Sequence, residues 1–189
     1  MNIFVLDQDP HIAASYVDDV RLPKMAVESA QMLASACVVN GATPDMMPLT
    51  QKGTPYRGGY PNHPCTIWAT RNRANFMWLY KHGLGLCEEY TRRFVGKRHS
   101  CHNPIIQMGK MAHLLPEGEL TPFAQAMPDE YKHEDPVVAY RAYYRGEKPN
   151  SKGGVRYRLT SWPDWWHEER EEEPRDDEKT AYLKTLGLI

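Results

Sequence analysis

The stretch TIWATRNRANFMWLYKHGLGLCEEYTRRF, residues 66–94, is the longest helical pattern in the chain and decides the fold class. Its apolar side chains recur at intervals of three and four residues, which is the spacing that places them on one face of a helix. They are Phe76, Leu79, Tyr80, Leu86, Cys87, Tyr90 and Phe94. The pattern predicts one long amphipathic helix, which Gly83 and Gly85 are positioned to bend or divide.

Two further helices are expected before this stretch. Asp9 followed by Pro10 is an N-cap and first-turn signature for a helix over 11–20. A second helix over 23–39 begins at Pro23, and Met25, Met32, Leu33, Ala36 and Cys37 mark its buried face. Residues 42–64 are rich in proline and glycine and predict a long loop, a kind of segment that is usually functional.

The regions outside these helices complete a mainly α prediction. Residues 2–6 form an apolar run that is either a strand or a buried extended arm, and 96–131 should be irregular with short helical turns. The Asp135-Pro136 pair starts a helix over 136–145, and a last helix is expected over 176–186. We predict a single helical domain over 1–166, with long irregular loops and at most a short N-terminal strand. An acidic extension with a terminal helix should follow over 167–189.

Composition restricts the class of protein. The chain has 189 residues, of which 41% are hydrophobic and 25% charged, and this suits one compact domain. No apolar run approaches the roughly 20 residues that cross a bilayer, and the N-terminus lacks the features of a signal peptide. Four widely spaced cysteines favour reduced thiols and therefore a cytoplasmic protein without a membrane partner.

Charge is unevenly distributed along the chain. Residues 52–110 contain ten Lys or Arg against two Glu, whereas the segment from Trp166 to the end contains eight acidic residues against four basic ones. A basic middle beside an acidic end is typical of a protein that meets phosphates, although a mixed solvated surface gives the same count.

Three residues are candidates for catalysis. Lys24 and Glu28 are four positions apart, so their side chains should meet on one helix, either as a simple ion pair or as an amine with a proton-transferring acid. His63 closes the long loop and has a pKa suited to proton transfer, or else it caps the next helix.

Arginine, amide and aromatic side chains are candidates for substrate binding. Guanidinium and amide groups recognise phosphates, and aromatic rings stack on unpaired bases. Solvated ion pairs and core packing are the structural alternatives, and packing is favoured for the tryptophans. The candidates are Asn62, Arg71, Arg73, Asn75, Arg92, Arg93, Tyr143 and Trp162.

Motifs for bound metals and cofactors are missing. His99, Cys101 and His102 lack a second Cys/His pair at zinc-finger spacing. There is also no Walker A loop, no GxGxxG, no HExxH and no GxSxG sequence. We expect neither a metal nor a cofactor, and an enzyme built on this chain would use scattered acid, amine and imidazole groups, which suit chemistry on a base or glycosidic bond.

Two resemblances extend this interpretation. The opening MNIFVLDQDP (1–10), the Lys24-Met25 pair with Glu28, and the segments TPF (121–123), MPDEY (127–131) and YRAYY (140–144) resemble a group of small, largely uncharacterised bacteriophage proteins. This resemblance covers most of the chain and implies a phage origin, with expression in the cytoplasm of a bacterial host.

The second resemblance is to the pyrimidine dimer DNA glycosylases of the endonuclease V type. It rests on the N-terminal apolar turn, the acid-bearing helix with Glu28, and the element GYPNHP (59–64). That family is mainly α, flips a base, and uses its N-terminal amine as nucleophile beside a glutamate. The resemblance therefore implies that the Met1 amine and Glu28 carry the reaction.

The leading hypothesis is a phage-encoded, DNA-directed enzyme that excises or modifies a base, with Lys24, Glu28 and His63 at its centre. An enzyme acting on a free nucleotide or another phosphorylated metabolite is one alternative. A non-catalytic phage protein that binds a host component through its acidic end is another. The sequence leaves the oligomeric state open.

Overall fold

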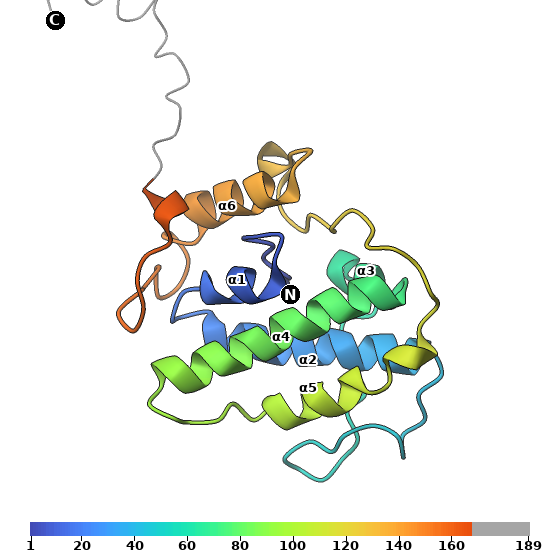
Figure 1. The fold of residues 1–189 in the computed structure, drawn as a ribbon. Helices are drawn as coiled ribbons and strands as arrows, with labels where there is room; N and C mark the ends of the chain where they lie inside the picture. The colour runs from blue at the N-terminus through green and yellow to red at the C-terminus, as the bar shows by residue number, and fades with distance from the viewer. Residues whose placement is uncertain (168–189) are drawn as a thin grey trace, which may run out of the picture.

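The helix α4 (Arg73–Arg93) lies across α2 (Leu22–Val39) at the centre of the fold (Figure 1). The structure is a computed structural model and describes residues 1–167. The short helix α1 (Pro10–Ser15) packs on α4, α3 (Pro64–Thr70) packs on α2, and α5 (His102–Gly109) contacts both long helices. The mainly α prediction is confirmed.

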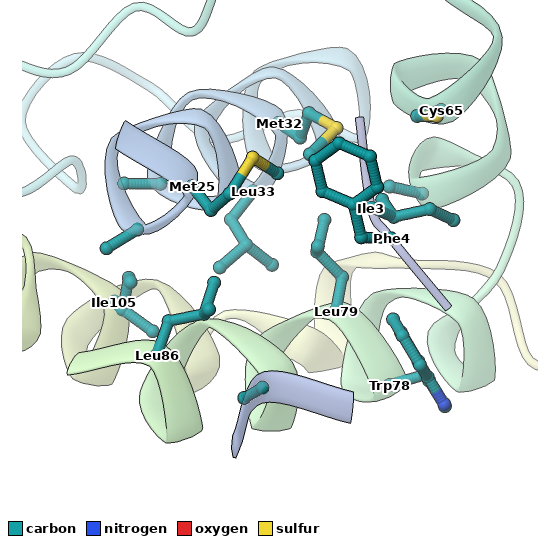
Figure 2. Close-up of a cluster of buried hydrophobic side chains, with 14 of the residues drawn as sticks. Ile3, Phe4, Met25, Met32, Leu33, Cys65, Trp78, Leu79, Leu86 and Ile105 are labelled. Carbon is teal, nitrogen blue, oxygen red and sulfur yellow. The ribbon is translucent and has the colours of Figure 1, made fainter. Parts of the chain in front are cut away.

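The core lies between the two long helices. Figure 2 shows Met25 and Leu33 of α2 pointing toward Leu79 and Leu86 of α4, with Ile105 of α5 beside them. Each of these side chains is at least 97% buried, which contributes about 1.5–3 kcal/mol per side chain to folding. The apolar stripes that the sequence predicts for these helices therefore face each other.

The predicted helix over 66–94 is two helices, not one. Asn72 adopts an extended backbone between α3 and α4, and its side-chain oxygen accepts a hydrogen bond from the Asn75 backbone N–H at 2.9 Å. This bond satisfies one of the free N–H groups at the start of α4. The break therefore falls at an N-cap eleven residues before the first of the two glycines.

Gly83 and Gly85 lie inside a continuous α4 and do not interrupt it. A Cβ atom on Gly85 would lie 2.9 Å from the Cβ of Ala14, so a side chain there would collide with α1. The glycine thus allows α1 and α4 to approach closely.

The first residues form a buried extended arm. Ile3, Val5 and Leu6 are fully buried, and the only bridge in the described part of the chain joins Leu49 to Pro55 in the long loop. The helix α1 begins at Pro10 as predicted, with its N-cap at Asp9, but it ends at Ser15 and not at residue 20. The possible N-terminal strand is therefore an arm.

The helix α6 (Pro136–Glu147) covers the N-terminal arm (Figure 1). Tyr140 and Tyr144 face inward and are fully buried, as their spacing predicts, and the Tyr144 ring meets Phe4 edge-on at 5.0 Å between centroids. The helix continues through Gly146, where the sequence predicts its end.

The remaining segments are short 3-10 turns and loops. Single turns occur at Ala112–Leu114, Asp129–Tyr131 and Asp164–Trp166. All four cysteines are free thiols, as predicted, and all four are buried. No helix within residues 1–167 has the length and hydropathy that crossing a membrane requires. The predicted terminal helix over 176–186 lies outside the described residues.

Candidate active site

Asn2 fixes the N-terminal arm in place. Its side-chain oxygen accepts hydrogen bonds from the backbone N–H groups of Ile3 at 2.8 Å and Phe4 at 3.2 Å, and its amide donates to the Ala126 carbonyl at 3.0 Å. These bonds hold Phe4 in the left-handed region, at a φ of 32°, which non-glycine residues rarely adopt. The arm is therefore rigid where it enters the site.

The Met1 side chain is itself part of the core. It is only 2% exposed, and the buried Thr66 hydroxyl donates to its sulfur at 3.4 Å. Anchoring this side chain determines where the N-terminal amine points.

That amine points toward Glu28. The Met1 nitrogen lies 3.7 Å from one carboxylate oxygen of Glu28, and the Asn2 backbone N–H donates to the same oxygen at 2.9 Å. The Lys24 ammonium approaches the other oxygen at 3.2 Å. Glu28 is 7% exposed while the Lys24 side chain is 77% exposed, so the N-terminal amine and a solvent-exposed ammonium both approach one buried acid.

Two cavities open on this cluster. One, of about 360 Å³, lies between α2, the arm and α6, and the other, of about 280 Å³, lies between α2 and the long loop. Met1, Lys24 and Glu28 line both. The first is also lined by Arg21, Tyr143, Lys148 and Lys152, and the second by Gln31 and Tyr60.

The larger cavity combines positive charge with an aromatic wall. The Tyr143 ring stacks on Phe4 with a centroid separation of 6.3 Å, and the Lys148 ammonium lies 3.9 Å from the Tyr143 ring centroid. Arg21 donates to the Lys148 carbonyl at 3.0 Å and the Gly154 carbonyl at 2.9 Å, so α2 holds the segment that carries the cavity's lysines. An anion with an attached planar ring fits these surroundings.

His63 lies close enough to the cluster to sense its charges. Partial burial lowers the pKa of His63, the Met1 amine lowers it further, and Glu28 opposes both. Its Nδ1 accepts the Cys65 backbone N–H at 3.2 Å, so His63 also caps α3. The structure thus gives His63 the capping role and places it near the amine.

The other predicted binding residues are dispersed. Asn62 and Arg71 are exposed at the two ends of α3. Arg73 pairs with Glu117 at 3.1 Å beside a separate hollow of about 630 Å³. Trp162 packs on Tyr157 at 4.6 Å between ring centroids, away from the residues that line the two cavities.

Asn75 and Arg93 are structural residues, contrary to the prediction that they contact substrate. Asn75 is fully buried, and its amide donates to the Trp68 carbonyl and the Thr121 hydroxyl, both at 2.8 Å. The Arg93 guanidinium is fully buried and donates to the Val17 carbonyl at 2.6 Å. The N–H groups that would have to donate to a phosphate therefore already donate to other groups of the protein.

Arg92 remains exposed, and it forms an ion pair with Glu89 on the same helix. His99 accepts the Cys101 backbone N–H at its Nδ1, at 3.2 Å, and donates from its Nε2 to the Pro23 carbonyl at 3.1 Å. Within residues 1–167, no group of three or more His, Cys, Asp or Glu side chains is arranged to hold a metal ion.

Several residues at the site carry no clear sequence signal. Lys148 and Lys152 follow the end of α6 at Glu147 and have no spacing that indicates a cavity, and Tyr60 lies in a loop without periodicity. Arg21 pairs with Asp18 three positions earlier, but the contacts that bring it to the cavity are with carbonyls more than 120 positions away in the sequence.

A family model described as pyrimidine dimer DNA glycosylase matches residues 1–103, more than half of the chain. No curated protein and no solved structure matches the chain. The matched region contains the Met1, Lys24 and Glu28 cluster and the long loop with Tyr60. The wall with Tyr143 and Lys148 lies beyond it.

Proposed function

This chain belongs to the pyrimidine dimer DNA glycosylase family, and from that premise we propose that it excises a damaged pyrimidine from DNA by attack of its N-terminal amine. The observation that carries the proposal is the 3.7 Å approach of the Met1 amine to the buried Glu28 carboxylate in a lysine-lined cavity. The resemblance to phage proteins further supports a phage-encoded enzyme that acts in the cytoplasm of a bacterial host.

The proposed reaction begins with the neutral Met1 amine attacking C1′ of the damaged nucleotide. The bond from C1′ to the base breaks, and the base leaves with the bonding electron pair and takes up a proton. The sugar ring then opens as the C1′–O4′ bond breaks, O4′ gains a proton, and the nitrogen is left double-bonded to C1′ as a protonated Schiff base. Removal of a 2′ proton expels the 3′ phosphate, and water releases the enzyme.

Glu28 is proposed to move the protons in these steps. Its carboxylate faces the amine and can accept a proton from it after attack, and can then return one to O4′. Lys24 is proposed to hold the carboxylate charged and to contact the DNA backbone. The Met1 amine is proposed as the nucleophile in preference to Lys24, because a buried side chain fixes its position beside Glu28 whereas Lys24 extends into solvent.

Basic and aromatic groups around the cavity are proposed to hold the DNA. Lys148 and Lys152 lie where the backbone phosphates of the damaged strand would enter, and Tyr143 offers a ring to a flipped base. Asn62, Arg71 and Arg92 are exposed and available to neighbouring phosphates, and His63 is available to the leaving base.

The test is reductive trapping of the Schiff base. We expect borohydride to join the protein, produced with nothing fused ahead of Met1, to duplexes with a pyrimidine dimer or an abasic site. Undamaged duplex should give no adduct. Glu28→Gln should keep the hydrogen bond from Asn2 and slow trapping on the dimer by about 100-fold or more.

Glu117→Gln is the matched control, because Glu117 is 85% exposed and lies at a different hollow. It should trap at the wild-type rate. Absence of any wild-type adduct, together with inhibition by mononucleotides but not by duplex DNA, would support a metabolite enzyme instead. Wild-type trapping by Glu28→Gln would remove Glu28 from the mechanism.

A further inference from the structure

Tyr60 is an exposed aromatic residue at the edge of the candidate active site. Its side chain is 67% exposed, although large aromatic residues usually bury most of their surface. It lines the smaller cavity together with Met1, Lys24 and Glu28. An unburied ring therefore stands beside the reacting groups.

The backbone at Tyr60 is strained. Its φ of 52° lies in the left-handed region, which costs energy for a residue with a Cβ and persists only where the surroundings enforce it. The following turn enforces it from one side, because the His63 backbone N–H donates to the Tyr60 carbonyl at 3.0 Å.

The preceding residues enforce it from the other side. The Ser35 hydroxyl of α2 accepts the Gly59 backbone N–H at 2.9 Å and contacts the Gly59 carbonyl at 3.2 Å. Gly58 passes so close to Ser35 that a Cβ there would lie 2.7 Å from the Ser35 Cα. The loop is thus clamped to α2, and this clamp presents the Tyr60 ring outward at a conformational cost.

We propose that Tyr60 stacks on a DNA base that loses its stacking neighbour when a nucleotide at the lesion is flipped out of the duplex. This inference rests on the proposed function and assigns Tyr60 a substrate contact within it. Flipping a nucleotide leaves an unstacked gap in the duplex, and aromatic side chains stabilise such bases regardless of sequence. Tyr60 is exposed at the edge of the smaller cavity, whereas Tyr143 is half-buried against Phe4 and lines the larger one.

The test compares two glycine substitutions. Val95 is also non-glycine, has the same φ of 52° and is 92% exposed, but it follows α4 and lines neither cavity. Tyr60→Gly and Val95→Gly should each keep or raise the melting temperature, because glycine adopts this backbone without strain. Only Tyr60→Gly should reduce trapping on the dimer duplex, by about tenfold or more.

A second readout reports stacking directly. The fluorescent base 2-aminopurine is placed next to the dimer, so that it is the base that becomes unstacked. Wild-type protein should quench its fluorescence on binding. Tyr60→Phe should retain this quenching, and Tyr60→Gly should lose it. Equal trapping and quenching by wild type and Tyr60→Gly would overturn the inference while leaving the glycosylase proposal intact. Loss of both in Tyr60→Phe would also overturn it, since the ring alone should suffice. A wild-type protein that traps no DNA would overturn both proposals.

Discussion

The Glu28 carboxylate accepts a hydrogen bond from the Asn2 backbone N–H and also lies beside two amino groups, those of Met1 and Lys24. The side chains that carry these two amino groups differ in exposure. The Met1 amine is held by a buried side chain, whereas Lys24 extends into solvent, where an ion pair contributes at most about 1 kcal/mol. The position of the Glu28 carboxylate should therefore depend far more on its contacts with the N-terminal arm than on its ion pair with Lys24.

This difference gives a prediction for Lys24→Gln. The free energy of unfolding of the variant should lie within about 1 kcal/mol of the wild-type value. The variant should still form the borohydride adduct, but it should bind DNA more weakly and with a smaller dependence on salt. Peptide mapping of the adduct should identify Met1 as the modified residue in both proteins. An adduct on Lys24 in wild type, lost in the variant, would instead make Lys24 the nucleophile.

Helical spacing is sufficient to predict that Lys24 and Glu28 meet, because partners four residues apart share a helix face. The same spacing predicts the ion pair of Arg93 with Glu89, which forms at 2.9 Å, but it does not predict that the Arg93 guanidinium is buried. Burial brings in further partners, the carbonyls of Val17 and Ser15, which lie close because α4 packs against the turn after α1. The placement of the Met1 amine beside Glu28 is likewise predicted by the resemblance to the glycosylase family and not by any residue pattern.

At the scale of elements, the apolar stripe predicts the presence of α4 but not its beginning. The periodicity continues across Asn72, so only the local capping bond reveals the break. Gly83 and Gly85 are misleading for the opposite reason, because glycine can mark close packing between helices as well as a helix end. Helix content was thus predictable, while boundaries depended on contacts with distant segments.

The cap at the start of α4 should be important for stability. Asn72→Ala removes the bond to the Asn75 N–H and also leaves the Glu119 carbonyl without the amide that donates to it at 2.9 Å. Urea denaturation should show a loss of about 1–2 kcal/mol in the free energy of unfolding. Arg71→Ala, one residue earlier at an exposed position, should leave the free energy unchanged. Equal stability of Asn72→Ala and wild type would show that the cap is dispensable.

At the scale of the whole molecule, the site joins segments from both ends of the described chain. Asn2 binds the carbonyl of Ala126, and Arg21 binds those of Lys148 and Gly154. Residues 1–103 alone supply the reacting groups, but α6 and the segment after it supply one wall of the larger cavity. No local pattern predicts this convergence, since it arises from tertiary packing.

The core also contains a histidine that should make global stability depend on pH. His82 is fully buried and stacks on Trp78 at 5.1 Å between centroids, and neither of its ring nitrogens has a hydrogen-bond partner among residues 1–167. Burial lowers its pKa to about 3, from the ordinary value of 6.5. Between these two values the unfolded chain binds a proton that the folded protein does not, so stability falls as the pH falls below 6.5 and continues to fall until about 3.

From pH 7 to pH 5, His82 should account for a loss of about 2 kcal/mol in the free energy of unfolding. His82→Leu keeps an apolar side chain against Trp78 and removes the titrating group. Urea denaturation at both pH values should therefore show a smaller loss in the variant by that amount. His63 and His99, whose pKa values are also lowered by burial, remain in both proteins and cancel from the comparison. The same loss in both proteins would mean that the pKa of His82 is not lowered by burial in the folded state.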